Sequence, residues 1–122
     1  MRESDKELIR SFLSSKKINE WISFGEMEVY VRKSKRYFPS IKDGFISCFD
    51  VANVNVIDGE QGKGKFTSFF DVVIELAQVQ GYDAIYIESV INSKFAESLS
   101  KKKGMIEIST DKNQRNFVYK LK

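Results

Sequence analysis

Residues Val54–Phe66, with the sequence VNVIDGEQGKGKF, run directly into an amphipathic segment that ends near Gln80. The apolar start of this stretch predicts a buried strand, its three glycines and two lysines predict a turn, and the segment after them predicts a helix. A turn of this kind presents unpaired backbone N–H groups beside the positive end of the helix dipole. The sequence therefore predicts a binding site for a phosphate or pyrophosphate group at the start of this helix.

Helical patterns occur in three segments of the chain. Ser4 and Glu7 have the spacing of a capping box, which predicts a helix from about Asp5 to Ser15. A cap at Asn92 or Ser93 predicts another helix late in the chain. The helix after the glycine turn carries one apolar stripe at helical spacing, formed by Phe66, Phe69, Phe70, Val73, Leu76 and Ala77.

The remaining apolar segments have the character of strands. The expected strands cover residues 27–31, 45–57, 84–88, 105–109 and 116–121. A kink is expected near Asp50, and the short apolar run 84–88 suits a central parallel position. Residues 16–25 are interpreted as a connector in which Trp21, Ile22 and Phe24 pack down. The order of elements predicts one α/β (α+β) domain that spans residues 1–122, with a mixed and mostly antiparallel sheet.

Composition narrows the class of protein. The chain has 122 residues, 42% hydrophobic content and a formal net charge of +3, which fits a folded domain with one core. Its single cysteine, Cys48, is interpreted as a buried core residue and excludes an intramolecular disulfide. No apolar run approaches the roughly 20 residues that span a bilayer. We expect a cytoplasmic protein without a membrane segment or metal site, and the absence of histidine excludes histidine-based catalysis.

One basic stretch allows two interpretations. Arg32, Lys33, Lys35 and Arg36 stand next to two aromatic residues, a combination that can contact nucleic acid. A solvated strand end is the preferred interpretation, because one short basic patch at near-neutral net charge is common. Nucleic acid is therefore not the expected partner.

The glycine turn and its surroundings resemble the GNAT superfamily of acyl-CoA-dependent N-acyltransferases, and look most like its short phage-type members. The main motif of that family is Gln/Arg-x-x-Gly-x-Gly/Ala after the fourth strand. The run Gln61 to Phe66 fits its first four positions, with Phe66 in place of the final small residue. The second motif of the family corresponds to Asn92 or Ser93, followed by Ala96. The tyrosine of that motif falls on Leu99 or Ser100 here.

The resemblance covers residues 29–105 and implies a parallel strand pair that splays apart where coenzyme A binds. The backbone of the strand before the turn would pair with the pantetheine arm, and the amides after it would hold the pyrophosphate. The implied acetyl-CoA-binding residues are Val54, Asn55, Val56, Gln61, Gly62, Lys63, Gly64, Lys65, Phe66, Thr67, Asn92 and Ser93.

The resemblance also implies a catalytic carboxylate. Some members of the family use a strand carboxylate eleven residues before the motif's glutamine as general base, and this position is Asp50. Glu88 is a second candidate for the base. The alternative for Asp50 is a structural carboxylate that bonds its neighbours.

Two functions follow from these features. The first is direct transfer of an acetyl group from acetyl-CoA to a primary amine on a small molecule or a protein. The second is a non-catalytic protein with this fold that binds a host or partner protein. The acceptor and the oligomeric state are not encoded in any motif of the sequence.

Overall fold

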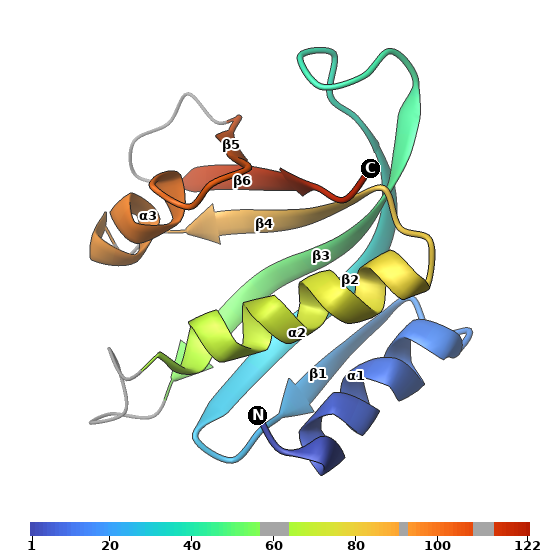
Figure 1. Cartoon of the computed structure of the whole chain (residues 1–122), viewed down its shortest axis with the longest axis vertical. Helices are drawn as coiled ribbons and strands as arrows, with labels where there is room; N and C mark the ends of the chain where they lie inside the picture. The colour runs from blue at the N-terminus through green and yellow to red at the C-terminus, as the bar shows by residue number, and fades with distance from the viewer. Residues whose placement is uncertain (57–63, 91–92, 109–113) are drawn as a thin grey trace.

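The computed structural model describes residues 1–56, 64–90, 93–108 and 114–122 (Figure 1). Its elements in chain order are α1 (Glu3–Ser14), β1 (Asn19–Ser23), β2 (Met27–Tyr37), β3 (Phe45–Val56), α2 (Lys65–Val79), β4 (Ala84–Val90), α3 (Ser93–Ser100), β5 (Met105–Glu107) and β6 (Arg115–Lys120).

The strands form one six-stranded sheet in the order β1-β2-β3-β4-β6-β5. Among the strands of the described residues, only the neighbours β3 and β4 are parallel, and the other four pairings are antiparallel. Helix α2 connects the parallel pair, as a crossover between parallel strands requires. The predicted mixed, mostly antiparallel sheet with one central parallel pair is confirmed.

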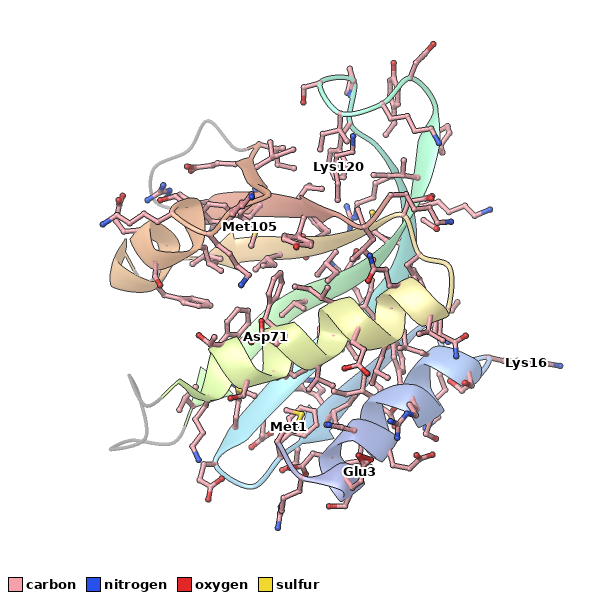
Figure 2. The ribbon with its side chains drawn as sticks, in the orientation of Figure 1. Met1, Glu3, Lys16, Asp71, Met105 and Lys120 are labelled. Carbon is pink, nitrogen blue, oxygen red and sulfur yellow. The ribbon has the colours of Figure 1, made fainter. Side chains whose placement is uncertain are left out.

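The two faces of the sheet are covered differently. Helices α1 and α2 lie across one face (Figure 1), and side chains fill the space between these helices and the strands (Figure 2). This is the main core, and its fully buried strand residues include Val29, Val31, Phe49, Ile85 and Phe117. The opposite face carries a smaller cluster around Cys48 and Tyr86, covered in part by Phe38, Ile41 and Ile108.

The parallel pair is short because its strands part. β3 pairs with β4 only from Cys48 to Val51, opposite Ala84 to Ile87. Beyond this point β3 continues to Val56 along β2, while β4 continues to Val90 along β6. The strands therefore open like a V toward their carboxyl ends, which confirms the splayed parallel pair that the resemblance implied.

A bulge marks the place where the strands part. Tyr30 of β2 lies opposite Asn53, but the next residue, Val31, lies opposite Val51. Ala52 is therefore the extra residue on β3, and such an insertion bends a strand and increases its twist. The predicted kink near Asp50 lies two residues further along the chain.

Two sequence interpretations were wrong at the N-terminal end. Residues 19–23 form the edge strand β1 in place of an irregular connector, and strand periodicity turns Ile22 inward and leaves Trp21 half exposed. Helix α1 begins at Glu3, two residues earlier than the capping box predicted, and Arg2 takes the N-cap position in place of Ser4. The backbone N–H groups of Asp5 and Lys6 donate to the carbonyl of Arg2, so Ser4 lies inside the first turn.

Candidate functional site

The start of α2 lies at the opening between the parted strands. Gly64 precedes the helix with a φ of +77°, a left-handed conformation that glycine adopts without a steric penalty. The first turn of α2 contains no acidic residue. Its leading N–H groups, from Lys65 through Thr67, have no acceptor within the helix and stand at the positive end of its dipole. This is the arrangement that binds phosphate groups.

The structure places only part of the predicted turn. Gln61, Gly62, Lys63 and Asn92 lie outside the described residues. Ser93 is the first residue of α3.

Phe66 connects α2 to α3. Its ring centroid lies 4.6 Å from that of Phe95 in an edge-to-face contact, and it also packs on Phe69 and Phe70. The Asp71 side chain of α2, labelled in Figure 2, pairs with Lys102 after α3 at 3.7 Å. The bulky residue at the end of the motif thus has a structural use, because it holds the two helices that border the opening.

Neither of the two residues at the position of the family's tyrosine can donate a proton as a phenol does. Leu99 is 4% exposed and belongs to the main core. Ser100 is exposed, and its hydroxyl donates to the carbonyl oxygen of Glu97 at 2.8 Å.

The open edge of β3 continues past the bulge. The side chains of Val54 and Val56 pack against the main core, while Asn53 and Asn55 are exposed. Over this stretch β3 pairs with β2, and the pairing with β4 has ended. In the described part of the chain, the edge of β3 from Ala52 to Asn55 that faces away from β2 has no strand partner, and an added extended chain can pair with such an edge.

Asp50 is completely buried, and both of its oxygens have partners. Oδ1 accepts from the hydroxyl of Ser34 at 2.8 Å, and Oδ2 accepts from Nη2 of Arg36 at 2.9 Å. Arg36 also donates from Nε to Ser34 and lies over the ring of Tyr86. Buried charges are tolerated when they are paired and hydrogen-bonded, as here.

Glu88 has a different environment. It is the first residue of β4 after the pairing with β3 ends, and 30% of its side chain is exposed. Nη2 of Arg32 donates to Oε2 of Glu88, and the Nε atom of Arg32 lies 3.5 Å from Oδ2 of Asp50. One guanidinium therefore joins both predicted carboxylates, and only Glu88 is accessible to a ligand.

Two further titratable groups lie next to these carboxylates. Burial, and then the charge of Asp50, raises the pKa of Cys48 to about 12, so this buried residue stays a thiol at neutral pH. Burial and the charge of Glu88 raise the pKa of Tyr86 above its usual value. Neither group supplies a nucleophile at neutral pH.

Sequence reasoning missed the role of the basic stretch. Arg32, Ser34 and Arg36 alternate along β2 and donate to the acidic residues of β3 and β4. Lys33, on the other face, donates to the carbonyl of Ser15 at 2.6 Å and lies over the ring of Phe12. Local periodicity gave no signal for this role, because residues 32–36 contain no apolar residue and their strand partners on β3 are distant in the sequence.

A cleft of about 660 Å³ lies beside the start of α2. Its walls combine both signs of charge. Asp5 is 8% exposed and pairs with Arg2 at 3.4 Å, and Lys65 pairs with Glu26 at 3.8 Å. The described residues contain no group of three potential metal ligands and no helix long and apolar enough to cross a membrane.

This architecture is the GNAT fold, the fold of the acyl-CoA-dependent N-acyltransferases. No protein-family model and no curated protein sequence matches the chain. Among solved structures, the chain is similar to the KacTA–DNA complex, with a TM-score of 0.57 and 15% identity over 94% of this chain and 80% of that one.

Two similar structures contain the coenzyme. A mutant of the AtaT toxin, bound to the C-terminus of its antitoxin AtaR and to acetyl-CoA, has a TM-score of 0.55 and 14% identity over 78% of this chain. The NatC complex bound to Gag peptide and CoA has a TM-score of 0.53 and 10% identity over 99% of this chain and 93% of that one. The chain spans 58% of the length of the AtaT chain.

Proposed function

We propose that this protein transfers an acetyl group from acetyl-CoA to a primary amine by direct attack. The observation that carries the proposal is the opening between β3 and β4, with the N-terminus of α2 beside it. The GNAT fold supports the proposal, because solved structures with this fold, AtaT and NatC, hold acetyl-CoA or CoA.

The donor would lie in the opening between the strands. In this arrangement the backbone of Val54 to Val56 pairs with the pantetheine arm as an added strand would. The amides from Gly64 to Thr67 hold the pyrophosphate, and Lys65 adds positive charge. The predicted contributions of Gln61, Gly62, Lys63, Asn92 and Ser93 belong to the same proposal.

The transfer needs a neutral amine at the thioester. The amine nitrogen attacks the carbonyl carbon, the N–C bond forms, the C–S bond breaks, and the thiolate takes a proton. An ammonium acceptor gives up two protons during the reaction, so one proton is released overall when CoA leaves as the thiol. A thiol has a pKa of about 8.5, so water can protonate the departing thiolate without a tyrosine at residue 99 or 100.

Of the two predicted bases, the geometry favours Glu88. A general base must come within hydrogen-bond reach of the proton it removes, directly or through one water. Glu88 is partly exposed at the point where the strands part. Asp50 is fully buried, and Ser34 and Arg36 occupy its oxygens. In this proposal Asp50 orients the arginines, and Glu88 receives the proton.

Thermal unfolding with acetyl-CoA tests donor binding. A ligand that binds only the native state raises stability by about 2.7 kcal/mol at one hundred times its Kd, so the melting temperature must rise. Acceptors are then screened by release of the CoA thiol, using spermidine, peptides with a free N-terminal amine, and an aminoacyl-tRNA. The last is included because AtaT has been seen with acetyl-methionyl-tRNA.

The outcomes separate the candidate functions. A thermal shift with amine-dependent thiol release supports the transferase. A thermal shift without release for any acceptor favours a non-catalytic protein that binds CoA. If millimolar acetyl-CoA leaves the melting temperature unchanged, the transferase proposal is wrong.

A further inference from the structure

Arg32 lies between an accessible carboxylate and an inaccessible one. It donates from Nη2 to Glu88, whose side chain is 30% exposed, while its Nε atom points to the fully buried Asp50. The Arg32 side chain itself is 29% exposed. The contact with Glu88 is therefore reachable from solvent, whereas Asp50 is not.

The Nε–H group of Arg32 is not satisfied in this position. Its nitrogen is buried and has no hydrogen-bond acceptor in the part of the chain that the structure describes. The nearest oxygen of Asp50, at 3.5 Å, is beyond the 2.7–2.9 Å typical of charge-assisted bonds. A buried donor without an acceptor is unfavourable. A small movement of the guanidinium toward Asp50 would satisfy it and weaken the contact with Glu88.

We propose that Arg32 occupies the position on Glu88 that the ammonium group of the acceptor takes, and that acceptor binding moves Arg32 onto Asp50. The identity of this ligand as a primary ammonium rests on the proposed function. Guanidinium and ammonium groups carry the same charge and donate N–H bonds to the same oxygens, so they compete for one carboxylate. The hydrogen bond that Arg32 gains with Asp50 offsets part of the loss at Glu88.

The surroundings of Arg32 indicate the direction of approach. Two residues earlier on β2, Tyr30 packs against Trp21 with ring centroids 5.2 Å apart, and Trp21 is 50% exposed. Elsewhere on this sheet face, Phe38, Ile41 and Ile108 pack against the cluster around Cys48 and Tyr86. An amine therefore reaches Glu88 from the side of the Trp21–Tyr30 pair, whose ring faces also attract cations.

The movement of Arg32 can be observed without turnover. The probe is methylammonium chloride, and the readout is the Nε–H signal of Arg32 in ¹H–¹⁵N spectra, assigned by its loss in Arg32→Lys. We expect methylammonium to shift this signal saturably toward its position in Glu88→Gln. Tetramethylammonium has no N–H donor and serves as the matched control at equal ionic strength. A signal that methylammonium leaves in place overturns the proposal.

Kinetics with an acceptor found in the thiol-release screen add a second test. In Arg32→Gln the KM for the amine should fall about threefold to fivefold, the effect expected when a partly exposed ion pair no longer competes. Arg32→Lys keeps the competing cation and should keep the high KM. In the Glu88→Gln background, Arg32→Gln should leave KM unchanged. A KM that rises in Arg32→Gln would contradict the proposal.

The two proposals fail separately. If the protein acetylates an amine but methylammonium does not move the Arg32 signal, the proposed competition for Glu88 is rejected and the transferase proposal stands. An Arg32 signal that moves with methylammonium, without transfer to any amine, rejects the transferase and retains the ammonium site.

Discussion

Single residues decide how the two candidate carboxylates differ. Asp50 and Glu88 both contact Arg32, but Asp50 is fully buried and Glu88 is not. Removing one partner of a buried ion pair leaves an uncompensated charge, while a partly exposed carboxylate is replaced at little cost. We therefore expect substitution of Asp50 to lower mainly the stability, and substitution of Glu88 to lower mainly the turnover.

Asp50→Asn should lower the free energy of unfolding by about 3 kcal/mol, because Arg36 loses its buried counter-charge. Glu88→Gln should change it by less than about 1 kcal/mol but reduce turnover by roughly a hundredfold, as expected for loss of a general base. Urea denaturation and thiol release measure the two effects. Unchanged turnover in Glu88→Gln together with a large loss in a folded Asp50→Asn would return the base role to Asp50.

At the scale of elements, one contact between helices borders the proposed coenzyme site. Phe66 of α2 contacts Phe95 of α3, and Phe66 stands at the position where the family motif has a small residue. Phe66→Ala should reduce the free energy of unfolding by about 2 kcal/mol, since this ring is only partly buried. Phe66→Leu keeps most of the apolar contact and should lose less than half as much. Equal losses in both variants would show that the aromatic geometry matters more than the buried area.

The closed end of the parallel pair is held by Asp83. Its Oδ2 atom accepts from the backbone N–H of Ser47 at 2.8 Å and from the Ser47 hydroxyl at 3.1 Å. The backbone hydrogen bond from Ser47 is the main cause that lowers the pKa of Asp83 below its usual value. These bonds fix β3 to the start of β4, opposite the end where the strands part.

Asp83→Ala should lower the free energy of unfolding by about 1 kcal/mol at pH 7. Because the folded-state pKa is depressed, the stabilisation is present above the unfolded value of about 3.9 and is lost as the pH falls through the folded value. Urea denaturation between pH 7 and pH 3 should show the wild type and the variant converging at the acid end. Ser47→Ala removes one of the two donors and should be intermediate, whereas a constant difference at all pH values would exclude the titration of Asp83 as its cause.

At the scale of the whole molecule, most residues of the basic stretch bond to groups within the protein, which leaves little positive charge for a polyanion such as DNA. The formal net charge is +3, and three residues of the basic stretch, Arg32, Lys33 and Arg36, have partners inside the protein. We expect only weak binding to duplex DNA, with an affinity that falls less than about tenfold between 50 and 200 mM salt. Fluorescence anisotropy with a labelled duplex measures this, and a fall of a thousandfold or more would support a nucleic-acid interface.

Most of the element order could be predicted, because it depends on local periodicity. The apolar stripe of α2, the alternation in β2 and the glycine turn each require only neighbouring residues. The prediction from sequence failed where pairing between distant segments, and not the local pattern of apolar residues, decides the secondary structure. Within the segment 16–25, which has weak periodicity, residues 19–23 form a strand because β2 offers them an edge. Strand β2 extends to Tyr37 because β3 pairs along its full length.

The sequence by itself determined the fold class, the helix that follows Gly64 and the residue types available for chemistry. Only the tertiary structure decided which of these residues work together. Arg32 and Glu88 are 56 positions apart, and the register of three strands brings them into contact. That register, with one bulge at Ala52, depends on the packing of the whole sheet, and it buries Asp50 while it leaves Glu88 partly exposed.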